Sequence, residues 1–153
     1  MKLKLTTLFI ALASLGLTFQ SCEKDENETK VSYYSASESH NEGQNCMSCH
    51  VSGGDGEGWF TVAGTVYETN KTTTNPKSTV RFYTGAGGTG TLKATVEVDA
   101  RGNFYTTESV DFGNGLYTMV ESSTGNKEYM AGKVTSGACS SCHGSSTDRV
   151  WVK

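Results

Sequence analysis

The pattern C-x-x-C-H occurs twice in this chain of 153 residues, at positions 46–50 and 139–143. The cysteines and histidines of the two motifs are Cys46, Cys49, His50, Cys139, Cys142 and His143. The chain has five cysteines and three histidines, so the motifs hold all but one of each. Any fold that this chain adopts must therefore accommodate two identical cysteine–histidine segments separated by about ninety residues.

This motif is the attachment site of c-type haem. Cysteines three positions apart on one turn point in the same direction, so both sulfurs can bond the vinyl groups along one haem edge. The histidine that follows lies below the ring, where its imidazole binds the iron as the proximal ligand. The sequence therefore predicts two haem c groups, attached through the four motif cysteines, with His50 and His143 as proximal ligands.

Three other interpretations of the cysteines remain open. Two C-x-x-C pairs can bind one structural zinc ion, although the intervening stretch is long for a zinc ribbon. In an oxidising compartment each pair can form a local disulfide, or the two pairs can cross-link. Neither disulfide arrangement explains the histidine after each second cysteine. A thioredoxin-like redox site is the third interpretation, and the βαβ context of that motif is missing.

The N-terminal segment predicts export and lipid attachment. Lys2 and Lys4 precede an apolar stretch, residues 5–17, which is too short for a comfortable membrane span. A small residue and then Cys22 follow, which resembles a bacterial lipoprotein signal in which the cysteine is lipid-modified. An ordinary secretory signal with an unrelated cysteine is the alternative. We expect a signal peptide over residues 1–21 and a lipid-anchored protein of the cell envelope, at the outer membrane, periplasmic or surface-exposed.

Composition divides the rest of the chain. Residues 22–45 are rich in Glu, Asp, Ser and Asn, which predicts a flexible, solvated tether. Residues 46–58 and 135–153 are the two predicted haem-binding segments, on either side of residues 59–134. The net charge is −3 and no basic patch is interleaved with aromatic residues, which argues against nucleic acid as a partner. The acidic surface suits redox partner proteins with a basic patch.

Residues 59–134 carry the pattern of β-structure. They are rich in Thr, Val, Tyr, Phe and Gly, without a long apolar stripe of helical period. Short alternating stretches predict six strands, over residues 59–68, 78–84, 92–98, 103–107, 115–122 and 127–134. The expected fold class is mainly β: a Greek-key-like β-sandwich flanked by short haem-binding segments. An even number of alternating strands would bring both motifs to one end of the sandwich.

The same region resembles a known family of sandwiches. Residues 63–67, the D-x-x-G-x-F pattern at 99–104 and residues 115–117 are similar to the carboxypeptidase-regulatory or prealbumin-like domain, over roughly residues 60–122. That resemblance implies a seven-stranded scaffold without catalysis of its own. The whole arrangement, with one motif before and one after the sandwich, resembles small bacterial envelope c-type cytochromes. It does not resemble the helical cytochrome c fold.

Few residues are available for the sixth position of each iron. His40 is the one histidine outside the motifs and is a candidate distal ligand; its alternative role is a solvated surface histidine. Met130 lies nine residues before Cys139 and is the second candidate; its alternative role is to fill a gap in the packing.

The expected function is electron transfer by a lipid-anchored dihaem cytochrome. No Ser/His/Asp arrangement, paired carboxylate motif or phosphate-binding glycine loop is found, so no catalytic residue is predicted. The alternative is a surface or binding lipoprotein module whose cysteine pairs form disulfides or a structural metal site. A third possibility is small-ligand sensing or peroxide chemistry at an iron with an open sixth position.

Overall fold

The computed structural model describes residues 27–153. The predicted signal peptide over residues 1–21, the lipidation site at Cys22 and the start of the predicted tether lie outside these residues. The helices of the described part are three short 3₁₀ turns. None of them has the length and apolar character needed to cross a membrane.

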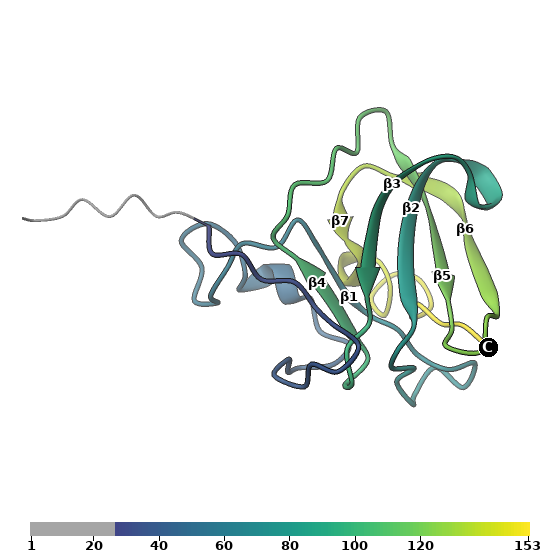
Figure 1. Ribbon diagram of the computed structural model, residues 1–153. Coiled ribbons are helices and arrows are strands. Elements are labelled where there is room, and N and C mark those ends of the chain that lie inside the picture. Colours follow the sequence, from purple (N-terminus) through teal and green to yellow (C-terminus); the bar gives the residue numbers. More distant parts are fainter. Residues whose placement is uncertain (1–26) are drawn as a thin grey trace, which may run out of the picture.

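Two β-sheets form the body of the protein (Figure 1). The larger sheet has the order β3-β2-β5-β6, made of β2 (Thr79–Gly85), β3 (Thr89–Glu97), β5 (Leu116–Glu121) and β6 (Lys127–Val134). The smaller has the order β4-β1-β7, made of β1 (Val62–Thr65), β4 (Asn103–Thr106) and β7 (Gly137–Ala138). The predicted fold class, a mainly β sandwich, is confirmed.

The observed strands follow the predicted ones with one addition. All six predicted segments overlap a strand, and residues 127–134 match β6 at both ends. The addition is β7, which has two residues and pairs with β1 in parallel. So short a strand carries no alternation that a sequence pattern can detect. Because residues 27–153 form seven strands, the argument from an even number is wrong. Both motifs nevertheless lie against β1, since β7 runs beside it and leads directly into the second motif.

The core fills the space between the sheets. Its fully buried side chains include Val62, Val80, Phe82, Val96, Val98 and Phe104. Because side chains alternate along a strand, Val62 and Phe104 point inward from the small sheet, and Asn103 and Tyr105 point to its outer face. Asn103 is nevertheless only 2% exposed, so another part of the chain covers this outer face.

That cover comes from residues 30–45, so the prediction of a flexible tether is wrong for this part. Val31 forms a β-bridge with Thr106, and the buried Ser32 donates a hydrogen bond from Oγ to Glu97 O at 2.6 Å. Gly43 N donates to Thr65 Oγ1 at 2.9 Å. The polar composition of the segment misleads because a few of its groups bond to the sandwich, while most of its residues stay exposed at the surface.

Candidate functional site

The two C-x-x-C-H segments have the same local structure. Each begins with one 3₁₀ turn, η1 (Cys46–Ser48) in the first and η3 (Cys139–Ser141) in the second. The backbone N–H of His50 donates to the carbonyl of the first cysteine at 3.0 Å, and that of His143 does the same. The same turn thus forms in two unrelated surroundings, which indicates that the motif's own sequence determines it.

A serine stabilises each turn. Ser48 Oγ donates to the carbonyl of Asn45 at 2.7 Å, and Ser141 Oγ donates to that of Ala138 at 2.6 Å. These side-chain bonds join the serine to the residue just before the turn, and in the first motif the backbone N–H of Ser48 donates to the same Asn45 carbonyl at 3.0 Å. Both serines directly precede the second cysteine, so the turn and the direction of that cysteine are fixed together.

The four motif cysteines are free thiols. Cys49 and Cys142 are exposed, whereas Cys46 and Cys139 are partly buried. Burial raises the pKa of Cys46, and it raises the pKa of Cys139 to about 12.

The ligand geometry of a structural zinc site is also not formed by the described residues. Within residues 27–153, no three His, Cys, Asp or Glu side chains come close enough together to hold one metal ion. A zinc ribbon brings four such ligands to one point. The two motifs instead face two separate pockets.

A backbone carbonyl orients the imidazole ring of each motif. His50 Nδ1 lies 2.8 Å from Glu57 O, and His143 Nδ1 lies 2.6 Å from Asp148 O. Because a carbonyl oxygen only accepts, Nδ1 carries the proton in both rings. In the neutral ring this leaves Nε2 with a free lone pair, which is the state that a metal ligand requires. The two carbonyls are seven and five residues after their histidines, so different loops produce the same orientation.

The first motif faces a pocket of about 250 Å³. His50 stacks on Phe60, with ring centroids 4.2 Å apart and planes at 11°, and Phe60 stacks on Tyr105 at 4.9 Å. His40 lines the same pocket, with its ring centroid 6.0 Å from that of His50. The structure therefore brings the predicted distal ligand together with the first motif.

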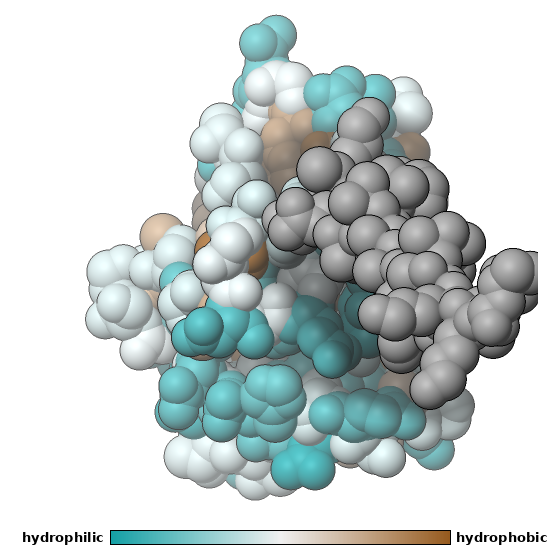
Figure 2. Space-filling model, turned by 90° about the vertical axis from the view of Figure 1, so that its left-hand side faces the viewer, coloured by the Kyte–Doolittle hydropathy of each residue, from teal (hydrophilic) through white to brown (hydrophobic). Residues whose placement is uncertain are grey.

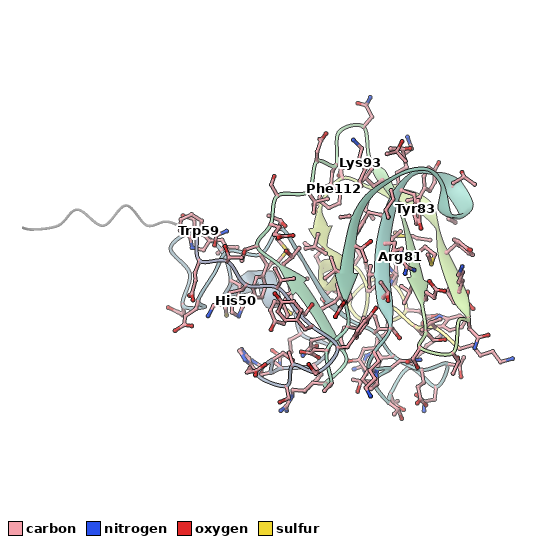
Figure 3. The ribbon with its side chains drawn as sticks, viewed as in Figure 1. His50, Trp59, Arg81, Tyr83, Lys93 and Phe112 are labelled. Atoms are coloured by element: carbon pink, nitrogen blue, oxygen red, sulfur yellow. The ribbon has the colours of Figure 1, made fainter. Side chains whose placement is uncertain are left out.

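This first pocket lies on the outer side of the small sheet. Figure 3 shows His50 on the side of β1 and β4 that faces away from the four-stranded sheet. Figure 2 views the molecule from that side, and hydrophilic residues cover most of the lower half of the visible face. Glu38 and Glu57 are among the residues that line the pocket.

The second motif faces a larger pocket of about 480 Å³. It extends between η3 and the large sheet, where it is lined by Cys142, His143, Met130 and Trp151, and by the core residues Val80, Phe104 and Val120. The second predicted distal ligand, Met130, therefore shares a pocket with His143. The thiol of Cys139 also lines this pocket.

The two sites lie on opposite faces of the small sheet. On β4, Asn103 and Tyr105 line the first pocket, and Phe104 between them lines the second. On the inner face the second motif packs closely against β1 at Gly64, where an added Cβ would lie 2.7 Å from Phe104 Cζ and 3.1 Å from Cys139 Cβ. Burial is the largest cause of the raised pKa of Cys139, and the charge of the nearby Cys46 raises this pKa further. One layer of backbone therefore separates the two sites.

Several residues around the first pocket were not identified from the sequence. Phe60 and Tyr105 look like any aromatic residues of a strand, and no local signal distinguishes them. Asn103 follows the D-x-x-G pattern that we interpreted only as part of the sandwich. The signal that points to it is a polar residue directly after this turn, at the start of a strand.

No protein-family model, no curated protein and no solved structure matches this chain. The functional argument therefore depends on the chemistry of the two motifs and their pockets. Each site combines two unpaired thiols, an imidazole with a free Nε2 and an adjacent pocket with an apolar part. These features fit the covalent attachment of a haem at each motif.

Proposed function

We propose that this chain is a dihaem c-type cytochrome of the bacterial cell envelope, which transfers electrons between redox partner proteins. The observation that carries the proposal is the repeated site: in both motifs a carbonyl fixes the imidazole so that Nε2 is free, next to two unpaired thiols. A disulfide staple or a structural turn has no use for a histidine oriented in this way.

Each motif residue has a defined role in this proposal. The thiols of Cys46 and Cys49 hold the first haem, and those of Cys139 and Cys142 hold the second. His50 and His143 bind iron through Nε2, while the carbonyls of Glu57 and Asp148 keep the rings in place. A bound haem supplies one-electron oxidation and reduction, and the chain supplies attachment, axial ligands and electrostatics.

The pockets supply the two proposed sixth ligands. His40 lines the first pocket and Met130 lines the second, so each is placed near a different motif. Histidine–methionine ligation raises the reduction potential of a haem relative to two histidines. With these ligands, the second haem has the higher potential.

The proposed partners and location follow from charge and the N-terminus. Lipid attachment at Cys22 would keep the protein at a membrane of the envelope, and the net charge of −3 suits a partner with a basic patch. Such docking between exposed charges weakens as salt screens it. We therefore propose association with redox proteins that is sensitive to ionic strength.

The test is to measure haem content. The mature chain is produced with and without a cytochrome c maturation system, and the haem-to-protein ratio is determined by pyridine haemochrome absorbance. We expect two haems per chain with maturation and none without it. A ratio near zero under both conditions overturns the proposal.

Intact-mass measurement distinguishes the alternative function. Two added haem masses support the cytochrome, whereas a loss of four hydrogens indicates two disulfides and a non-haem module. The variant with all four motif cysteines changed to serine is the control, because it can form neither.

A further inference from the structure

Residues 39–43, just before the first motif, are fastened to the small sheet on both sides of His40. Asn103 Nδ2 donates to Ser39 Oγ at 3.0 Å and to His40 O at 3.3 Å. On the other side, Gly43 N donates to Thr65 Oγ1 at 2.9 Å. The backbone that carries the His40 imidazole is therefore anchored to β1 and β4.

The amide of Asn103 is itself held in a buried polar network. Thr65 Oγ1 donates to Asn103 Oδ1 at 2.6 Å, and Asn103 N donates to Asp99 Oδ1 at 2.9 Å. Asn103 and Asp99 are almost completely buried, and Asp99 Oδ2 has no hydrogen-bond partner among the described residues. Burying such a group reduces stability. What the network provides is an amide side chain with one defined position.

His40 and His50 are close enough for both imidazoles to bind one metal ion. Metal–nitrogen bonds are about 2 Å long, so two imidazoles on opposite sides of one metal have ring centroids roughly 6 Å apart. The centroids of His40 and His50 are 6.0 Å apart, and both rings line the first pocket. The chain has three histidines and the other belongs to the second motif, so only the first site can have two.

We propose that Asn103, supported by Asp99, is a positioning residue that presents His40 to the iron of the first haem, so that this haem alone has two imidazole ligands. This inference rests on the proposed function and adds to it a difference between the two sites. The hydrogen bonds from Asn103 hold the backbone of His40 in place before haem is attached. The exposed ion pair between Arg101 and Glu42 is not required to hold His40.

The test uses the dihaem protein and a set of variants: H40A, N103A, N103D and the control R101Q. N103D keeps an oxygen for Thr65 but loses both donated bonds to residues 39 and 40. R101Q removes a surface ion pair to Glu42, at 2.7 Å, in the same segment. The readout is the low-spin bis-imidazole signal in electron paramagnetic resonance, with the haem-to-protein ratio measured on each sample.

We expect a bis-imidazole signal from one haem in the wild type and in R101Q. In H40A the signal disappears and added imidazole restores it. In N103A and N103D the affinity of the iron for His40 falls roughly 10–100-fold, measured by competition with carbon monoxide on the reduced protein. If N103A fails to fold, N103D alone tests the role of the two hydrogen bonds that Asn103 donates.

Two results overturn the inference: a bis-imidazole signal that survives H40A, or Asn103 variants that compete with carbon monoxide as the wild type does. Both require a haem-to-protein ratio near two, so they leave the proposed function standing. A wild-type ratio near zero overturns the proposed function instead, and the inference with it.

Discussion

The two C-x-x-C-H segments are alike within themselves and different in what surrounds them. Each forms a 3₁₀ turn, exposes its second cysteine, and holds its histidine by a hydrogen bond from Nδ1 to a carbonyl. The first faces a pocket on the outer face of the small sheet, lined partly by residues 38–45, whereas the second faces a pocket lined by core residues of both sheets. A short motif thus determines its own turn, and the fold determines which side chains reach the far side of its pocket.

The largest expected effect separates the two sites by haem content. The double variants C46S/C49S and C139S/C142S each remove both attachment points of one motif. Because each motif holds its own haem in our proposal, we expect each variant to fall from two haems per chain to one. Pyridine haemochrome absorbance measures this ratio.

A loss of both haems in either double variant would contradict the independence of the sites. The control is C22S, which removes the proposed lipid attachment and leaves both motifs intact. It should keep two haems per chain while losing its association with membranes.

The next effect concerns the cysteines of the haem-free chain. Iodoacetamide at pH 8 should modify the exposed Cys49 and Cys142 first and Cys139 last. Burial raises the pKa of Cys139 to about 12, which leaves roughly one thiol in 10⁴ as thiolate at this pH. We expect Cys139 to react at least about ten-fold more slowly than Cys142.

Peptide mapping by mass spectrometry after timed quenching gives the four rates. Equal rates for Cys139 and Cys142 would show that the first cysteine of the second motif is not buried as described. Urea-unfolded protein is the control, in which all four thiols should react alike.

A third effect tests the close packing of β1 against Phe104 and the second motif. Gly64→Ala places a Cβ 2.7 Å from Phe104 Cζ in the buried core, so neighbouring atoms must move. We expect the free energy of unfolding to fall by about 1–3 kcal/mol. Because Cys139 Cβ is the next contact at 3.1 Å, the spectrum of the second haem should change more than that of the first.

Gly132→Ala on β6 is the matched control, since an added Cβ there meets no atom within 4 Å. Urea unfolding curves of both variants measure the difference. If Gly64→Ala is as stable as Gly132→Ala, the close approach of β1, Phe104 and the second motif is wrong.

The fourth effect is a pH dependence of the haem-free chain, which appears only at alkaline pH. The folded pKa of Cys139, about 12, lies above the ordinary thiol value of 9.0. Between these two pH values the Cys139 thiol is deprotonated in the unfolded chain and still protonated in the folded chain. The free energy of unfolding therefore falls as the pH rises. The contribution is present below pH 9.0 and falls by up to about 1.4 kcal/mol per pH unit above it.

Unfolding of the haem-free wild type and of C139S across this pH range isolates the contribution as a difference. The difference should vanish in the haem-loaded protein, because a thioether sulfur does not titrate. Parallel curves for the wild type and C139S in the haem-free state would contradict the raised pKa.

Much of the fold followed from local patterns. Period-two alternation located six of the seven strands, because inward and outward side chains repeat within each strand. The pattern failed at β7, whose two residues pair with β1 across a long stretch of chain. The polar composition of residues 30–45 also misled, because the Ser32 hydroxyl and the Gly43 backbone N–H bond to the sandwich.

The repeated C-x-x-C-H motif by itself determined the chemistry available at each site and the turn that presents it, because the bonds that shape the turn join residues within a few positions of one another. Only the tertiary structure decided that the sites lie on opposite faces of one small sheet, and that His40 faces one and Met130 the other. The bond that fastens Ser39 to Asn103 joins residues 64 positions apart, and a contact of that kind exists only after the sheets have packed.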